Sequence, residues 1–155
     1  MKTKGILNPQ LAALVAEMGH GDILLIADRG IPFPQHNRTV CIDLSVKDGM
    51  PKVTDVMEVV LSELEVESVI ISEETKEVSP QVYQDFKEIL NRIDNKGNPI
   101  REENIKHIDF KNIFLTGKPV NPDAIDLTGR EVKGIVRTGQ FTPYAYIMLV
   151  AGVNF

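Results

Sequence analysis

The hydrophobic positions of the chain alternate between helical and strand spacing from one segment to the next. Apolar residues at positions 11, 14, 15 and 18 have the i, i+3, i+4, i+7 spacing of an amphipathic helix. Asn8 and Pro9 suit the first positions of such a helix, so we expect it to run from Pro9 to Met18. The continuous apolar run Ile23–Ala27 follows and is typical of a strand that is covered on both faces.

The same alternation continues along the rest of the chain. Helical spacing returns over Val53–Leu64 and over the segment Pro80–Ile93, which the residues Asn95–Pro99 are expected to end. The β-branched run Val69–Ile71 between these helices predicts a buried strand. The remaining predicted elements are a strand at Thr39–Val46, a short helix at His107–Phe114, and two final strands at Val132–Val136 and Tyr144–Val153.

Helices that alternate with buried strands predict an α/β fold, in which a mostly parallel central sheet is flanked by helices in layers. The 155 residues match the size of one domain, and we expect residues 1–155 to form it. A stretch rich in Gly, Pro, Asn and Asp predicts an irregular excursion at about 115–133. Ligands of such sheets bind beyond the carboxyl ends of the strands, which makes Asp28 a candidate site residue.

Composition and charge narrow the function classes. The chain is 43% hydrophobic and carries a net charge of -5, which provides no electrostatic basis for binding nucleic acid. The longest apolar run, Tyr144–Ala151, is much shorter than the ~20 residues of a membrane span, and the N-terminus lacks an apolar signal segment. The single cysteine, Cys41, excludes an intrachain disulfide. We therefore expect a cytoplasmic protein that binds neither nucleic acid nor membranes.

Common cofactor motifs are absent. The chain contains no Walker loop, no nucleophile elbow and no complete dinucleotide fingerprint, and its three histidines lack metal-ligand spacing. We expect no metal and no cofactor. His20 is a candidate general acid or base, because histidine transfers protons near neutral pH, although capping the preceding helix is the more ordinary role for a histidine at this junction. Asp28 could bind a ligand, or it could accept backbone N–H groups from the turn at Gly30.

Two further pairs of polar residues are candidates. His107 and Lys111 lie four positions apart and would share one face of a helix, where such a pair is ordinarily solvated. Tyr144 and Tyr146 would point to the same face of the final strand, where packing at the sheet edge is the ordinary role.

Several short segments together resemble the D-ribose pyranase and L-fucose mutarotase family, which is a family of sugar-isomerising proteins. The segments follow one another in the family's order and span most of the chain, except for about 115–133. The loop Asp28–Pro34 resembles the ribose branch more than the fucose branch. The segments are Leu7-Asn8, Met18–Asp22, Asp28–Pro34, Ile42–Leu44, Glu73–Lys76, Arg137–Ala145 and Ala151–Val153.

The resemblance implies an isomerase, without metal or cofactor, that interconverts the pyranose and furanose forms, or the anomers, of an aldose, with D-ribose as the first choice. It implies a ring-shaped homo-oligomer with monosaccharide sites at the subunit contacts. It also implies that His20 is the proton donor. The substrate-binding residues that it implies are Asp28, His107, Lys111, Tyr144, Ala145 and Tyr146.

Geometry adds one constraint and leaves two solutions open. A strand between His20 and Asp28 would separate them by up to ~26 Å, at ~3.3 Å per residue, which one sugar cannot bridge. Either the chain bends sharply at Gly21-Asp22, or two subunits contribute one end of the site each.

The chain also departs from the family pattern at two places. Tyr146 stands where the family has Asn, and the excursion is longer than in the family. L-fucose or another aldose therefore remains an alternative substrate. A sugar-binding or sugar-sensing module without turnover, and a structural oligomer, are the non-enzymatic alternatives.

Overall fold

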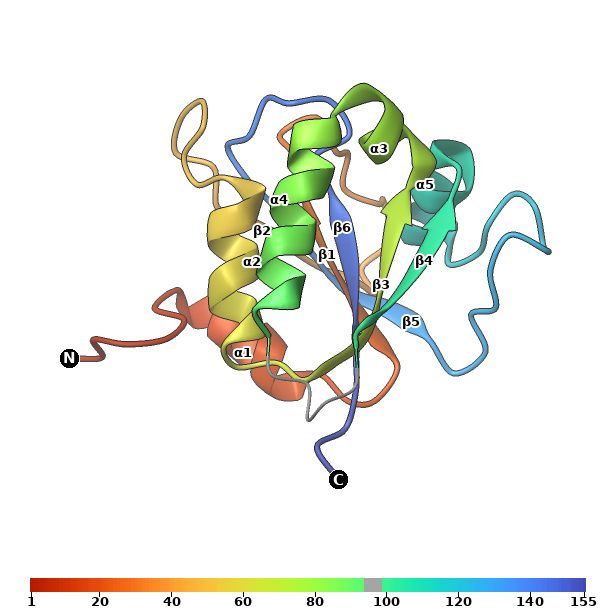
Figure 1. Cartoon of the computed structure of the whole chain (residues 1–155). Coiled ribbons are helices and arrows are strands. Elements are labelled where there is room, and N and C mark those ends of the chain that lie inside the picture. Colours follow the sequence, from red (N-terminus) through yellow and green to blue (C-terminus); the bar gives the residue numbers. More distant parts are fainter. Residues whose placement is uncertain (94–98) are drawn as a thin grey trace.

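A six-stranded sheet forms the centre of the computed structural model, which describes residues 1–93 and 99–155 (Figure 1). The strands are β1 (Asp22–Ala27), β2 (Val40–Asp43), β3 (Val66–Ser72), β4 (Arg101–Ile105), β5 (Glu131–Arg137) and β6 (Ile147–Ala151). Their order across the sheet is β2-β5-β1-β6-β3-β4. Only β6 runs against its neighbours, while the pairs β2/β5, β1/β5 and β3/β4 are parallel. The predicted α/β fold with a mostly parallel sheet is confirmed.

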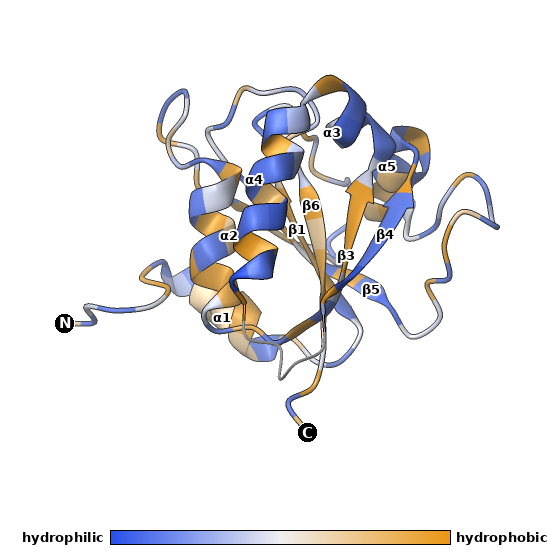
Figure 2. Cartoon of the chain, viewed as in Figure 1, coloured by the Kyte–Doolittle hydropathy of each residue, from blue (hydrophilic) through white to orange (hydrophobic). Residues whose placement is uncertain are grey.

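Helices cover both faces of this sheet. The helices are α1 (Pro9–Glu17), α2 (Val53–Leu61), α3 (Glu73–Val78), α4 (Pro80–Asn91) and α5 (His107–Thr116). One buried cluster joins α1, α2 and α4 to one face, and a second joins α5 and the segment after it to the other. The hydrophobic sides of the helices face the strands, and their polar sides face outward (Figure 2). Within the described ranges, no helix is long and apolar enough to cross a membrane.

The helix boundaries follow from local chemistry. Asn8 caps α1, because its side chain accepts the backbone N–H of Leu11 at 2.9 Å, and Pro9 occupies the first helical position. Gly117 ends α5 with a φ of 88°, a conformation that glycine adopts without steric cost. Helix α2 ends at Leu61, three residues before the predicted end.

Three differences from the predicted elements concern strands. β4 was not predicted, because its sequence, Arg-Glu-Glu-Asn-Ile, has four polar residues in five and lies at the sheet edge. β2 is shorter than Thr39–Val46. The final strand begins only at Ile147, so the prediction that Tyr144 and Tyr146 lie within it was wrong. The turn expected at Asn95–Pro99 lies, except for Pro99, outside the described residues.

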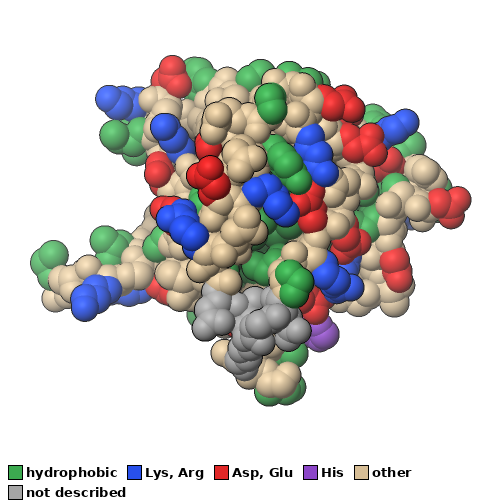
Figure 3. Space-filling model, viewed as in Figure 1, with side chains coloured by type: hydrophobic (Ala, Val, Ile, Leu, Met, Phe, Trp, Pro, Cys, Tyr) green, Lys and Arg blue, Asp and Glu red, His purple; other side chains and the backbone are tan. Residues whose placement is uncertain are grey.

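Ion pairs on the surface explain how the polar strand β4 is accommodated. Glu102 on this strand accepts hydrogen bonds from Lys76 at 2.9 Å and Lys87 at 2.8 Å, on α3 and α4. Burial alone would raise its pKa, but these cations and Asn104 lower the pKa of Glu102 to about 2. Basic and acidic side chains are interspersed over this face of the molecule (Figure 3).

Arg137 at the end of β5 holds the loop that leaves β1. Its guanidinium donates to Asp43 Oδ2 at 2.8 and 3.1 Å and to the Ile31 carbonyl at 3.2 Å, and it lies 4.1 Å from the centre of the Phe33 ring. Despite some burial, hydrogen bonds from Ser45 and Arg137 lower the pKa of Asp43 to about 2. The loop is therefore tied to the two neighbouring strands.

Gly21, at the turn into β1, provides a test of the fold. Its φ is 86°, and an added Cβ would lie 2.2 Å from the Gly129 carbonyl oxygen. Gly117 has a similar φ of 88° but open space around it. We expect Gly21→Ala to lower the free energy of unfolding by about 3 kcal/mol and the control Gly117→Ala by about 1 kcal/mol, because only the first adds a backbone clash. Urea unfolding measures the free energy of unfolding of both variants. Equal losses would contradict the close packing of the Gly129 carbonyl on Gly21.

Candidate functional site

The sequence candidates lie at two opposite edges of the sheet. His20 immediately precedes the turn into β1, whereas Asp28 immediately follows the strand. β1 is extended from Asp22 to Ala27, which separates its ends by ~17 Å at ~3.3 Å per residue. The turn at Gly21-Asp22 does not fold His20 back toward Asp28. Of the two solutions that the sequence left open, a sharp bend within the chain is therefore excluded.

A group of side chains gathers near Asp28, and we call it the carboxyl-edge cluster. It consists of Asp28, His107, Tyr144 and Tyr146. The His107 ring centre lies 5.2 Å from that of Tyr144, edge to face, and 5.7 Å from that of Tyr146. The Tyr144 and Tyr146 rings are 6.2 Å apart. The loop before β6 therefore brings the two tyrosine rings together, and not the alternation of side chains along a strand.

Ala145 and Lys111 complete the surroundings of this cluster. The backbone N–H of Ala145 interacts with the Asp28 carboxylate, as does that of Gly30 at 2.8 Å. Lys111, one helical turn after His107, acts on the His107 ring electrostatically. The structure therefore brings six of the seven predicted site residues to one edge, while His20 lies at the other.

Burial dominates the electrostatics of Asp28. It raises the pKa of this carboxyl to about 6, although the N–H groups of Gly30 and Ala145 favour the charged form. Burial likewise lowers the pKa of His107, an effect that Lys111 reinforces and Glu74 opposes. Near neutral pH the cluster consequently presents an ionised Asp28 and an uncharged imidazole.

Tyr146 is the most enclosed member of the cluster. It is 2% exposed, and its hydroxyl lies 2.5 Å from His107 Nδ1 and 3.1 Å from Ser72 Oγ. Burial raises the pKa of Tyr146 well above its usual value, so the phenol stays protonated. The backbone N–H of His107 donates to Glu74 Oε2 at 2.7 Å, which fixes the start of α5 beside the tyrosines.

His20 lies in a polar hollow at the opposite edge, which we call the amino-edge pocket. Its volume is about 470 Å³. His20 Nε2 is 3.0 Å from Glu67 Oε2, and the His20 side chain is 58% exposed. The pocket is lined by His20, Gly21, Glu67, Arg101, Glu103, Asp126, Thr128, Gly129 and Arg130.

A register irregularity places Glu67 beside His20. The pairing of β3 with β6 shifts between Val66 and Ser68, and a bulge of this kind can redirect a side chain. β6 lies between β1 and β3, so the two side chains meet beyond its end. Gly152 leaves space for Glu67 in this contact, because an added Cβ at Gly152 would lie 3.1 Å from Glu67 Cβ.

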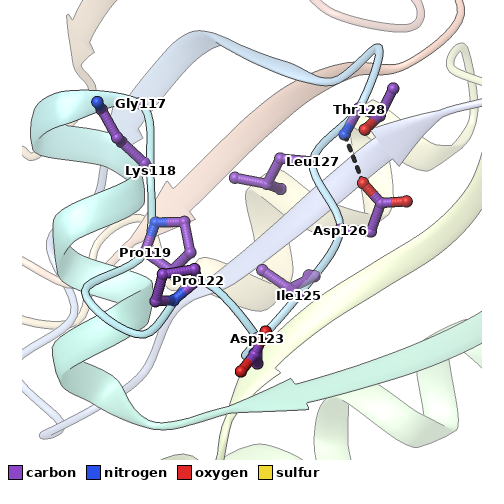
Figure 4. A pocket seen from close by; sticks show the side chains of 9 residues that line it. All are labelled: Gly117, Lys118, Pro119, Pro122, Asp123, Ile125, Asp126, Leu127 and Thr128. Atoms are coloured by element: carbon purple, nitrogen blue, oxygen red, sulfur yellow. Dashed lines mark hydrogen bonds between the residues drawn. The ribbon is translucent and has the colours of Figure 1, made fainter.

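The irregular excursion after α5 forms one wall of the amino-edge pocket. Within the excursion is a second hollow of about 570 Å³, with Pro119 and Pro122 on one side and Ile125 and Leu127 on the other (Figure 4). Two ties hold the excursion in place. Asp109 of α5 accepts the backbone N–H of residue 121 at 2.7 Å, and the Arg130 guanidinium lies 2.7 Å from Glu103.

Among the polar residues of these two regions that the sequence did not indicate are Glu67, Ser72 and Thr75. Glu67 has no local signal, because its contact with His20 depends on the bulge and on the course of β6. Ser72 has a local sequence signal, because serine is a preferred cap at the start of a helix. It caps α3, where its side chain accepts the backbone N–H of Thr75. Among residues 1–93 and 99–155, no three His, Cys, Asp or Glu side chains are grouped as a metal site requires.

Comparison with known proteins extends this picture. A family model described as the RbsD / FucU transport protein family matches residues 1–154. The chain is 39% identical to a protein named D-ribose pyranase from Pseudothermotoga lettingae, over all of this chain and 94% of that protein. It is 35% identical to a D-ribose pyranase from Actinobacillus pleuropneumoniae over the full length of both.

Solved structures agree with these sequence matches. The structure of Bacillus subtilis RbsD complexed with D-ribose covers all of both chains, with 34% identity and a TM-score of 0.78. A fucose mutarotase from Streptococcus pneumoniae, solved in complex with L-fucose, is 18% identical with a TM-score of 0.68 over 96% of this chain and 95% of that one, and it shows the shared fold.

The raised pKa of Asp28 generates a pH prediction. Its carboxyl should titrate with a midpoint near pH 6 in the folded protein, against an ordinary value of 3.8. Between these values the folded state binds more protons than the unfolded state, so this group makes the protein less stable as the pH rises from about 4 to 6. We expect Asp28→Asn to remove that part of the pH dependence. Carbon-13 NMR of the Asp28 carboxyl measures the midpoint, and a value near 4 would contradict the described burial.

Proposed function

This chain belongs to the RbsD / FucU transport protein family, and from that premise we propose that it is an isomerase that interconverts the pyranose and furanose forms of D-ribose. The reaction proceeds by acid–base ring opening and reclosure and requires no cofactor. The proposal rests on the structural similarity, over the full length of both chains, to Bacillus subtilis RbsD complexed with D-ribose. The residues at the two edges of the sheet supply groups suited to this chemistry.

Ring opening of a cyclic sugar requires only proton transfers. A proton leaves the anomeric hydroxyl, another reaches the ring oxygen, and the C–O bond of the ring breaks to give the open-chain aldehyde. Reclosure from a different hydroxyl reverses these steps and changes the ring size. A histidine can accept the first proton and donate the second near neutral pH, so one such residue suffices.

We assign this proton transfer to His20. The Glu67 carboxylate can only accept a hydrogen bond, so the neutral His20 ring donates to it from Nε2. The Nδ1 atom of His20 is then left as the base. Its half-exposed position in the amino-edge pocket gives a sugar access to this atom.

We assign sugar binding to the carboxyl-edge cluster together with Lys111 and Ala145. An ionised Asp28 accepts hydrogen bonds from sugar hydroxyls, and Lys111 donates them. The Tyr144 ring and the backbone at Ala145 border the same region. Such donors and acceptors replace the water that a polyhydroxy ligand loses on binding.

The separation of His20 from Asp28 has a consequence for assembly. Because the extended β1 keeps the two groups apart within one chain, one sugar can contact both only where two copies meet. We therefore include in the proposal a ring-shaped homo-oligomer of single-domain chains, residues 1–155, with each site at a contact between subunits. The amino-edge pocket of one copy faces the carboxyl-edge cluster of the next, and the excursion at about 115–133 borders the shared site.

The exchange of ribose forms tests the proposed activity. Saturation-transfer NMR measures the pyranose-to-furanose exchange rate without protein, with the native chain and with His20→Ala. We expect the native chain to accelerate exchange and His20→Ala to lower that acceleration by about 100-fold or more, since positioned acid–base groups contribute about that much.

The substrate range and the fold need their own controls. L-fucose and other aldoses in the same assay test the alternative substrates, and circular dichroism of His20→Ala confirms folding. Binding of ribose without any acceleration of exchange would refute the isomerase and indicate a sugar-binding module instead.

A further inference from the structure

Four hydrogen bonds link the hydroxyl groups behind His107 into one chain. Thr75 Oγ1 donates to the carbonyl oxygen of Tyr144 at 2.8 Å. Thr75 Oγ1 and Ser72 Oγ are 3.0 Å apart, and Ser72 Oγ and the Tyr146 hydroxyl are 3.1 Å apart. The last link is the 2.5 Å contact between the Tyr146 hydroxyl and His107 Nδ1. Ser72, Thr75 and Tyr146 are all buried, so water does not supply alternative partners.

The first link fixes the direction of all the others. A carbonyl oxygen only accepts, so the one hydroxyl proton of Thr75 is committed to Tyr144. Ser72 must then donate to Thr75. Because the single hydroxyl proton of Ser72 goes to Thr75, Ser72 must accept a hydrogen bond from the Tyr146 hydroxyl. The proton of Tyr146 is thereby committed to Ser72. Tyr146 can therefore only accept from His107, which requires a proton on His107 Nδ1.

We infer that this chain of hydroxyl groups holds His107 in the tautomer protonated at Nδ1, so that the opposite ring nitrogen, Nε2, is a bare acceptor for a sugar hydroxyl. The burial that disfavours a charged His107 supports a single proton on the ring. Within the described parts of the chain, no protein group hydrogen-bonds to Nε2. The assignment of a sugar as ligand rests on the proposed function, whereas the tautomer does not.

Within the carboxyl-edge cluster, to which we assign sugar binding, Tyr146 contributes through His107 and not by direct contact with the sugar. At 2% exposure, with its hydroxyl bonded on both sides, it acts on the ligand through His107 and is a positioning residue, as are Ser72 and Thr75. The His107 acceptor lies in the same cluster as the Asp28 carboxylate. Two acceptors within one cluster favour a ligand that presents several hydroxyl protons, which is a property of polyhydroxy compounds.

Nitrogen-15 NMR of the histidine rings tests the tautomer directly. In the native chain near neutral pH we expect a pyrrole-type signal from His107 Nδ1 and a pyridine-type signal from Nε2. Free neutral histidine favours the opposite form, so the result distinguishes a protein-imposed tautomer from the default. A pyridine-type Nδ1 in the native chain would overturn the inference.

Two substitutions probe the direction of the chain. Ser72→Ala removes the acceptor of the Tyr146 proton, which then turns to His107 Nδ1 and moves the ring proton to Nε2, so the two signals should exchange types. Tyr146→Phe removes the partner of Nδ1 and should have the same effect. Thr75→Ser keeps the hydroxyl and should preserve the native pattern. A native pattern in folded Ser72→Ala would also overturn the inference.

Tyr83→Phe is the matched control for Tyr146→Phe. This substitution removes the same hydroxyl group, which in Tyr83 hydrogen-bonds to Glu102, and Tyr83 packs on the face of the sheet opposite to Tyr146. Tyr83→Phe should leave the His107 signals and the ribose exchange unchanged. If Tyr83→Phe shifted the His107 pattern as strongly as Tyr146→Phe, the inference would fail.

Kinetics separate this inference from the proposed function. Ser72→Ala should raise the KM for D-ribose about fivefold and leave kcat within about twofold, because a lost hydrogen bond to the ligand weakens binding by about that factor. A fall in kcat with an unchanged KM would contradict a positioning role in binding. If the native chain failed to accelerate exchange at all, the proposed function would fail, and the ring-nitrogen signals alone would still decide the tautomer.

Discussion

The extended conformation of β1 is the constraint that decides where the candidate site residues lie. Its apolar residues are buried on both faces, and it is hydrogen-bonded between β5 and β6, so it cannot bend without breaking the centre of the sheet. His20 and Asp28 are consequently held at opposite edges. This separation is the reason that we propose a site shared between two copies of the chain.

The two edges differ in how they achieve their chemistry. At the amino edge, a bulge and a glycine bring Glu67 to an exposed histidine, whose ring is thereby oriented. At the carboxyl edge, burial controls the charges, since it raises the pKa of Asp28 and lowers that of His107. An oriented imidazole therefore occurs at each edge, and burial keeps the His107 ring uncharged near neutral pH. In the proposed function, His20 moves protons and His107 holds a sugar hydroxyl.

Periodicity and caps predicted most of the fold, because apolar spacing and local chemistry decide α1, α2, α4 and the buried strands. β4 was not predicted, because its Glu102 is stabilised by lysines of α3 and α4, which no pattern within the strand records. Six of the seven predicted site residues lie at the carboxyl edge of the sheet, and their binding of sugar stays a prediction. Glu67 could not be found, since its position depends on the register of β3 against β6, and the shift of Tyr146 from strand to loop depends on where β6 begins.

Mixed assemblies of two inactive variants show whether each site draws on two chains. His20→Ala and Asp28→Ala chains, each inactive alone, are unfolded together, refolded at equal amounts and checked by native mass spectrometry for mixed composition. Each shared site takes its two halves independently, so about a quarter of the sites, one half times one half, regain both intact groups. If each site is shared between two chains, ribose exchange should recover to about a quarter of the native rate. Mixed assemblies that show no recovery would contradict a shared site.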